Sequence, residues 1–466
     1  MGKGRASSNK KAEAGTQRNT RQQAPDNVRD VTQPGIANTK EQTRDAIRYI
    51  LILFLASRAI LTVIGVLARK YLGQLYNVGD IDNYVVNAAG EVVISPKLER
   101  TAESLEGVTQ VGLGTGYTWL DIWGVWDTRW YITIAKTWYS AAPDPYGQTP
   151  HAFLPLYPIL IKVFGLPFGN SYYGGLIVSN LALLVGAWFL YKVVCEMKGH
   201  AMGKRTVLFM FLFPTAFMLS AVFTEALFVA FSVGAFYCAR RKHWLVAGLL
   251  GGLSALTRLP GMFIAVLLFL EYMRQRRFSL PEIRADVLWI ALVPLGTFLF
   301  MLTGYVAKGS FLASFESQAA WGGSSMNPFT MLWNALDGTT KPPPVYPQDT
   351  ILWPIQRVTL GFWTFTPLLA FGAVLAIYVL AVLSWGYKHL DFPLLIWCAL
   401  LTLVPLARAR PLDPLVMPRY MLVVFPIFLI LAHLRPGRVA YYATVAVMVL
   451  VQVCAMVLWT NNYHIL

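Results

Sequence analysis

Long runs of apolar residues, separated by short polar segments, follow one another through most of the chain. A transmembrane helix needs about 20 apolar residues to cross about 30 Å of hydrocarbon, and the first such run covers residues 46–68. We predict eleven spans, at residues 46–68, 173–195, 206–219, 221–239, 244–257, 259–273, 285–306, 358–384, 391–407, 418–434 and 438–460. The predicted fold class is therefore an all-α polytopic membrane protein.

Short basic clusters between the apolar runs predict the orientation, because Lys and Arg are enriched in cytoplasmic loops. The clusters are the N-terminal tail, Lys198 with Lys204 and Arg205, residues 240–243, residues 274–277, Lys388 with His389, and Arg435 with Arg438. With all of them inside, residues 69–172 and 307–357 form two large outer loops. Arg69 and Lys70 oppose this orientation, since they follow the first span on the proposed outer side.

A further apolar run at residues 153–164 contains Pro155 and Pro158. If it crossed the membrane, every later basic cluster would fall outside, so we expect a re-entrant or surface helix there. Residues 1–45 are polar and basic, and we expect them to form a disordered cytoplasmic tail. Residues 46–466 are then one membrane domain.

The composition agrees with a membrane protein, since 56% of residues are hydrophobic and the mean hydropathy is +0.50. The net charge of +15 lies in loop clusters, so the expected partners are membrane lipids and not nucleic acid. The cysteines, Cys195, Cys238, Cys398 and Cys454, lie singly in apolar runs and are predicted to be packing residues. No Asn-x-Ser/Thr sequon occurs in the outer loops, which favours a bacterial plasma membrane.

Two predicted hairpins are too short for two full crossings. Residues 206–239 offer about 51 Å of helix and residues 244–273 about 45 Å, against about 60 Å required. We expect both to turn below the outer surface, where Glu225 and Arg258 would line an outward-opening cavity. A charge within the membrane indicates function. The alternatives are a structural pair between Glu225 and Arg258, a pairing of each with backbone, or a thinned bilayer.

The first outer loop contains the segment GVWDTRWYITIAKTWY at residues 124–139. If this segment and the residues before it form one helix, five apolar side chains lie on the same face of that helix. This stripe consists of Trp119, Trp123, Trp126, Trp130 and Ile134. A tryptophan face predicts a helix in the membrane interface. Thr118 is the expected N-cap, and capping together with the helix dipole explains Asp121.

Asp127 borders this stripe in the middle of the predicted helix, where capping cannot explain a carboxylate. It is therefore a candidate functional residue, and the alternative is a surface pair with Arg129 or Lys136. Arg419 ends a segment with three arginines and only Asp413 as counter-charge, which suits a lipid phosphate. Its alternatives are interfacial snorkelling or a pair with Asp413.

His151 immediately precedes the re-entrant segment. It is a candidate contact for a donor phosphate or an acceptor, and the alternative is a local hydrogen bond. No second His or carboxylate stands beside it at metal-ligand spacing, so we predict no metal site. We predict no obligatory cofactor.

The chain contains an ordered set of motifs through most of its membrane region. They are Trp126-Asp127-x-x-Trp130-Tyr131, Ala152-Phe153-Leu154-Pro155-Leu156-Tyr157-Pro158, Ser179-Asn180-Leu181, Phe213-Pro214-Thr215-Ala216-Phe217, Leu219-Ser220, Phe223-Thr224-Glu225-Ala226-Leu227-Phe228, Leu256-Thr257-Arg258 and Pro418-Arg419-Tyr420. In this set the chain resembles the PIG-V-like glycosyltransferases, bacterial relatives of the second mannosyltransferase of glycosylphosphatidylinositol anchor synthesis, within the GT-C superfamily. Leu154 and Thr128 depart from the family pattern, which usually has Phe and Gly there.

The resemblance implies a GT-C fold with juxtamembrane helices in the large first outer loop. It also implies transfer of a sugar, typically mannose, from a polyprenyl-phosphate donor to a lipid, glycolipid or other extracytoplasmic acceptor. By matched motif the catalytic base falls on Asp127, with inversion at the anomeric carbon. Desolvation by Trp126 and Trp130 would have to increase its basicity. The candidates for donor-phosphate or substrate binding are Arg258, Arg419, Glu225, His151, Tyr157, Arg129 and Asn180.

Two other function classes fit parts of the pattern. A flippase or transporter of lipid-linked sugars would share the basic loops and intramembrane charges, but it is expected to have repeated halves, and the sequence has none. A non-enzymatic scaffold would need no outer acid beside a charged cavity. The outer loop from Lys308 to Arg357 is either a lid over substrate or an inert connector.

Overall fold

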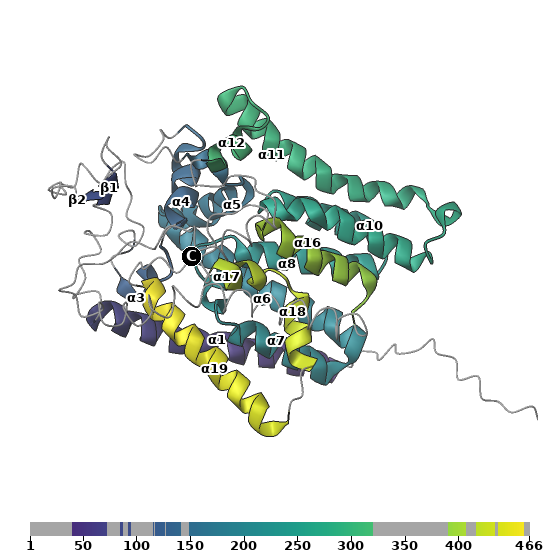
Figure 1. Ribbon diagram of the computed structural model, residues 1–466, viewed down its shortest axis with the longest axis horizontal. Coiled ribbons are helices and arrows are strands. Elements are labelled where there is room, and N and C mark those ends of the chain that lie inside the picture. Colours follow the sequence, from purple (N-terminus) through teal and green to yellow (C-terminus); the bar gives the residue numbers. More distant parts are fainter. Residues whose placement is uncertain are drawn as a thin grey trace, which may run out of the picture. The chain divides into compact units, whose positions relative to one another are not determined.

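Helices form nearly all of the regular structure in the computed structural model (Figure 1), which describes residues 40–71, 84–86, 92–94, 115, 117–125, 127–140, 149–319, 390–406, 416–433 and 437–460. The α-helices are α1 (Lys40–Tyr71), α3 (Thr118–Asp121), α4 (Thr128–Thr137), α5 (Leu156–Gly165), α6 (Ser171–Lys198), α7 (His200–Leu212), α8 (Glu225–Arg240), α9 (Trp244–Ala255), α10 (Ile264–Gln275), α11 (Leu292–Lys308), α12 (Ala313–Ala319), α16 (Phe392–Leu406), α17 (Val416–Leu422), α18 (Pro426–His433) and α19 (Arg438–Thr460). The 3-10 helices are η1 (Pro150–Ala152), η2 (Leu166–Phe168), η3 (Ala216–Leu219), η4 (Leu259–Phe263), η5 (Leu280–Glu282) and η6 (Ala285–Ala291).

One short antiparallel hairpin departs from the all-α prediction. Strand β1 (Tyr84–Val86) pairs with β2 (Val92–Ile94), and Val85 lies opposite Val93. Both strands come from the predicted first outer loop and consist mainly of β-branched residues, which favour extended backbone.

Three helices in the described part of the chain are long and apolar enough to cross a membrane: α1, α6 and the continuous helix of residues 285–308. The predicted total of eleven is therefore not confirmed. Helices α7, α8, α9 and α10 occupy four of the predicted spans but have only 13, 16, 12 and 12 residues. The predicted span at 418–434 is divided into α17 and α18, and the one at 358–384 lies outside the described residues, as does much of the second outer loop.

Helix α1 starts at Lys40, six residues before the predicted start of the membrane domain. The apolar run at 153–164 forms α5, whose ten residues are about 15 Å long, half of the hydrocarbon thickness. Helix α5 crosses α6 in backbone contact, because a Cβ added at Gly174 would lie 2.0 Å from the carbonyl oxygen of Ile161.

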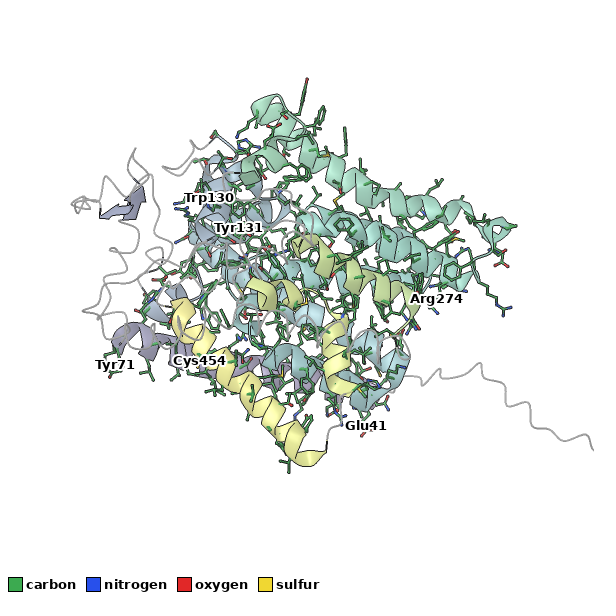
Figure 2. All side chains as sticks on the ribbon, in the orientation of Figure 1. Glu41, Tyr71, Trp130, Tyr131, Arg274 and Cys454 are labelled. Atoms are coloured by element: carbon green, nitrogen blue, oxygen red, sulfur yellow. The ribbon has the colours of Figure 1, made fainter. Side chains whose placement is uncertain are left out.

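The predicted cytoplasmic loops meet at one end of the helices through ion pairs. The pairs are Asp45 with Lys204 at 2.8 Å, Glu196 with Arg241 at 2.5 Å, and Arg240 with Asp391 at 2.6 Å. In Figure 2, Glu41 and Arg274 lie toward this end of the view, and Tyr71 and Trp130 lie toward the opposite end. The expected cytoplasmic loops at residues 196–205 and 240–241, which the structure describes, therefore share one end of the fold.

The tip of the α7–α8 hairpin lies at the other end, inside the protein. Helix α7 ends at Leu212, immediately before Phe213 and Pro214. Every residue from 215 to 230 is buried, including the irregular segment before α8. Helix α17 lies near α8 in Figure 1, and its arginine reaches the first residue of α8. This buried tip organises the candidate site.

Candidate active site

Glu225 is the first residue of α8, at the buried tip of the hairpin, and its side chain is 0% exposed. A carboxylate in such a position is costly unless cations and hydrogen-bond donors surround it. Arg258 supplies the first cation from the connection between α9 and α10, with Nη1 2.7 Å from Oε1 of Glu225. Arg258 can reach it because Pro260, at the start of η4, interrupts helix formation and leaves Arg258 extended.

Arg419, on α17, supplies the second cation. Its Nε donates to Oε1 of Glu225 at 2.8 Å, and its Nη2 donates to Oδ2 of Asp127 at 2.8 Å. Asp127 is the residue immediately before α4. Two carboxylates and two guanidinium groups from four separate elements therefore form one continuous network, which we call the ion cluster: Asp127, Arg419, Glu225 and Arg258.

Hydroxyl and aromatic groups complete the surroundings of the ion cluster. Arg258 donates from Nη1 to Oγ1 of Thr224 at 2.9 Å, and the Tyr131 hydroxyl lies 3.5 Å from the same Thr224 oxygen. The Arg419 guanidinium stacks over the Phe223 ring at 4.9 Å. Our sequence analysis did not single out Tyr131, Phe223 or Thr224, although each lies within a quoted motif and directly beside or near a selected residue.

Exposure increases across the ion cluster from Glu225 to Asp127. Side-chain exposure is 0% for Glu225, 13% for Arg258, 14% for Arg419 and 19% for Asp127. Glu225 is held by two arginines, whereas Asp127 is held by one. Asp127 is therefore the carboxylate of this cluster that an incoming molecule can reach. The alternative of a surface pair with Arg129 or Lys136 is not what the structure shows, because Asp127 pairs with Arg419.

The position of Asp127 depends on a break that we did not predict. Residues 118–134 form two helices, α3 and α4, instead of one. The carbonyl of Trp123 leaves the helical pattern to accept a hydrogen bond from the Val222 backbone at 2.9 Å. A Cβ at Gly124 would lie 2.4 Å from Cε2 of Tyr172, so the crowded break requires glycine there.

The expected tryptophan stripe is consequently wrong. Trp119 is 54% exposed, whereas Trp123 and Trp130 are 6% and 5% exposed and point into the protein. Trp130 stacks on Phe153 with ring centroids 5.9 Å apart. Trp126, expected to desolvate Asp127, lies outside the described residues.

The capping prediction for Asp121 is also wrong. The N-cap of α3 is Tyr117, without a side-chain cap, and Asp121 is the last residue of this helix. Its Oδ1 accepts a hydrogen bond from Oγ1 of Thr115 at 2.5 Å. Burial raises the pKa of Asp121 above its usual value. Asp121 makes no contact with the ion cluster in the described structure.

The other sequence candidates lie outside the ion cluster. The Tyr157 hydroxyl bonds to Ser179 at 2.8 Å and to the Gly175 carbonyl at 3.3 Å. Tyr157 contacts Tyr131 ring to ring at 5.1 Å, so it packs behind the cluster. Asn180 donates to the Leu176 carbonyl of its own helix at 2.7 Å. Both therefore satisfy buried polar groups in the helix packing.

Arg129 and His151 have aromatic neighbours. The Arg129 guanidinium lies over the Trp130 ring at 4.9 Å. His151 is 5% exposed, and neither ring nitrogen has a hydrogen-bond partner among the described residues. Burial and the positive charge of Lys308 lower the pKa of His151 to about 4, so the ring is neutral at pH 7. The expected local hydrogen bond of His151 is not formed.

The described residues contain no group of three or more His, Cys, Asp or Glu side chains placed to hold a metal ion. Both carboxylates of the ion cluster face arginines instead. Of the cysteines predicted to be packing residues, Cys195 and Cys398 are buried, whereas Cys454 is exposed.

Comparison with known proteins extends the sequence resemblance at a coarse level. The family model of dolichyl-phosphate-mannose-protein mannosyltransferase matches residues 149–300, about a third of the chain. This segment contains Glu225 and Arg258 but neither Asp127 nor Arg419. Among curated proteins, none matches the chain significantly.

Solved structures of an oligosaccharyltransferase from Archaeoglobus fulgidus are similar over most of this chain. The complex with Zn and sulfate is 14% identical, has a TM-score of 0.40, and covers 87% of this chain and 53% of its own. The form tethered to an acceptor peptide has 14% identity and a TM-score of 0.39. The match covers 88% of this chain and 55% of the other chain. The archaeal enzyme AglB with an inhibitory peptide and a dolichol-phosphate has 12% identity and a TM-score of 0.36, covering 88% and 56%. The chain spans about half the length of these proteins.

The family match over residues 149–300 agrees with the coarser prediction of a membrane glycosyltransferase. The narrower resemblance to PIG-V and the choice of mannose are not confirmed.

Proposed function

We propose that this chain transfers mannose from a polyprenyl-phosphate donor to a lipid or glycolipid acceptor, with Asp127 as the catalytic base. The observation that carries the proposal is the ion cluster. It joins four motifs of the resemblance, and its most accessible carboxylate is the one that the motif comparison selects. We place the reaction on the extracytoplasmic side of a bacterial plasma membrane, where the orientation of the basic loops puts Asp127.

The proposed chemistry needs a proton acceptor more than a proton donor. The sugar leaves behind a phosphate, which is already a stable anion, so its departure requires little protonation. The acceptor hydroxyl must lose its proton as its oxygen attacks the anomeric carbon, and a carboxylate within hydrogen-bond reach can take it. Attack from the face opposite the phosphate inverts the anomeric centre.

The arrangement of the cluster suits Asp127 to this role. Arg419 donates to Oδ2 of Asp127 at 2.8 Å and so fixes the orientation of the carboxylate. In the described structure Oδ1 has no donor, so this oxygen is available for the acceptor hydroxyl. Glu225 anchors Arg419 from a completely buried position, which fixes the guanidinium in place. Positioning of this kind contributes to rate as much as basicity does.

Arg258 and Arg419, proposed from the sequence as phosphate ligands, are both paired with carboxylates. We propose that their main task is to position Glu225 and Asp127. The N–H groups that these pairs do not use remain suitable donors to a substrate oxygen, since a guanidinium carries five of them.

Purified protein in detergent, incubated with polyprenyl-phosphate-mannose and a glycolipid acceptor, tests the proposal by release of polyprenyl phosphate. The Asp127→Asn variant should lose about 10²- to 10⁴-fold in kcat, the range for removal of a general base. Asp121→Asn is the matched control, because it changes a carboxylate of the same loop outside the ion cluster. Turnover of Asp127→Asn near the wild-type rate would exclude Asp127 as the base. Movement of intact donor across vesicles without release would instead identify a flippase.

A further inference from the structure

Arg58 lies within α1 and carries a buried guanidinium with no counter-charge in the part of the chain that the structure describes. Its Nε, Nη1 and Nη2 are all screened from solvent, and none has a hydrogen-bond partner among the described residues. At 1.5 Å per residue, its Cα is about 17 Å along the helix from Arg69, so Arg58 belongs to the apolar part of this spanning helix. A charged residue in such a position indicates function unless a partner explains it.

The aromatic neighbour of Arg58 does not explain it. The guanidinium lies 5.2 Å from the centroid of the Trp123 ring. A cation–π contact contributes about 0.5–2 kcal/mol, whereas removing a guanidinium from water costs several kcal/mol. The two arginines of the ion cluster, in contrast, each contact a carboxylate within 2.8 Å. Arg58 therefore has no anion among the described residues, and a ligand can provide one.

A chain of contacts through Trp123 and residues 222–223 links Arg58 to the ion cluster. It stacks on Trp123, whose carbonyl accepts a hydrogen bond from the Val222 backbone at 2.9 Å. The next residue, Phe223, carries the Arg419 guanidinium on its ring. The ion cluster itself has two positive and two negative groups and no net charge. Arg58, in contrast, has no carboxylate partner among the described residues.

We propose that Arg58 binds the phosphate group of the polyprenyl-phosphate substrate. This inference rests on the proposed function. A guanidinium matches two phosphate oxygens with parallel N–H donors, which is the strongest common recognition of this anion. Helix α1 also has an exposed apolar face on which the polyprenyl chain can lie, formed by Leu51, Ile52 and Leu55.

The reaction gives this cation a role in the transition state. The bond between the acceptor oxygen and the anomeric carbon forms while the bond from that carbon to the phosphate oxygen breaks. The electron pair of the broken bond stays on the phosphate, and the acceptor proton passes to Asp127. The donor is a phosphodiester with one negative charge, and the product monoester carries up to two. Arg58 therefore stabilises charge that increases as the sugar leaves.

Binding of polyprenyl phosphate, measured without turnover, tests the inference. Arg58→Met should weaken this binding by about tenfold or more, because it removes a charge-assisted contact. It should not change the binding of polyprenol, which lacks the phosphate. Arg48→Met is the matched control, since Arg48 is an exposed arginine of the same helix. Arg58→Lys, which keeps the charge but loses the two-pronged geometry, should lie between them.

Thermal unfolding separates a ligand site from a structural role. Without ligand, Arg58→Met should unfold at a higher temperature than wild type, because an uncompensated buried charge is removed. Polyprenyl phosphate should raise the unfolding temperature of wild type and of Arg48→Met but not of Arg58→Met. A lower unfolding temperature of Arg58→Met, with unchanged binding of polyprenyl phosphate, would overturn the inference.

Binding of phosphatidylglycerol, measured for the same variants, distinguishes a site for the substrate phosphate from a site for the phosphate of any membrane lipid. A loss of affinity confined to polyprenyl phosphate supports the substrate. An equal loss for both lipids supports a phosphate site but overturns its assignment to the substrate. The proposed function is tested independently: if Arg58→Met binds and turns over donor normally, only this inference fails. If wild type binds polyprenyl phosphate through Arg58 but releases none from the donor, only the enzymatic proposal fails.

Discussion

Replacing Arg419 with Met removes the centre of the ion cluster while keeping a side chain of similar length. The change breaks the contact with Glu225 at 2.8 Å and the contact with Asp127 at 2.8 Å. Glu225 is 0% exposed and keeps Arg258 at 2.7 Å, whereas Asp127 is 19% exposed and can recover water. The two carboxylates should therefore contribute unequally to the loss of stability.

The expected cost follows from these surroundings. Removing one partner of a buried ion pair destabilises a protein by about 3–5 kcal/mol. Because Arg258 remains on Glu225, we expect the lower end, about 3 kcal/mol, and Asp127 adds no more than about 1 kcal/mol. A loss of 3 kcal/mol changes the ratio of folded to unfolded protein by about 150-fold.

A second substitution tests the electrostatic explanation. The double variant Arg419→Met/Glu225→Gln no longer has a buried carboxylate short of a cation. Its loss of stability should be smaller than the sum of the two single losses by about 1–3 kcal/mol, as expected for residues in contact. If the losses of stability came from packing defects alone, the loss in the double variant would equal the sum of the two single losses.

Equilibrium unfolding in detergent micelles measures all three variants. Arg241→Met is the control, because Arg241 also pairs with a carboxylate but its side chain is 50% exposed. This control should lose less than about 1 kcal/mol. The reasoning is refuted if Arg419→Met is no less stable than Arg241→Met, or if the double variant loses the full sum.

Three further predictions concern other parts of the fold. Gly174→Ala should destabilise the protein by several kcal/mol and reduce turnover, because the new Cβ would meet the Ile161 carbonyl of α5 at 2.0 Å; Gly186→Ala, where the nearest atom is 3.3 Å away, should have a smaller effect in the same unfolding assay. The stability of wild type should fall as the pH decreases from about 6.5 to 4, since the unfolded chain takes up a proton that the buried His151, with a pKa of about 4, does not. His151→Phe should make this decrease shallower, whereas His243→Phe, at an exposed position, should leave its slope unchanged. Tyr157→Phe should cost about 1 kcal/mol through the lost hydrogen bond to Ser179 and change KM for the donor less than twofold, and a large KM effect would restore a substrate contact for Tyr157.

Much of the protein's character could be predicted from local sequence. Apolar runs identified a membrane protein, and the ends of helices α6 and α19 lie within three residues of the predicted spans. Hydropathy detects such helices because each span must bury its own polar backbone in hydrocarbon. Hydropathy detects less well the short helices α7 to α10, which pack against other helices. Helical periodicity, in turn, predicted one helix for residues 118–134 and missed its division into α3 and α4.

The motifs also identified Asp127, Glu225, Arg258 and Arg419 as residues of interest, but not their partners. Asp127 and Arg419 are separated by 292 positions, and Glu225 and Arg419 by 194. Sequence reasoning proposed nearby partners for Asp127, since spacing along a helix is all that it can measure.

The amino-acid sequence by itself determined that the chain is built for a lipid solvent and that a few charges had to be placed within it at a cost. Only the tertiary structure decided which charges neutralise each other and that Arg58 has no anion among the described residues. The physical reason is that hydropathy is a property of each segment alone, whereas the energy of a buried charge depends on every element that packs around it.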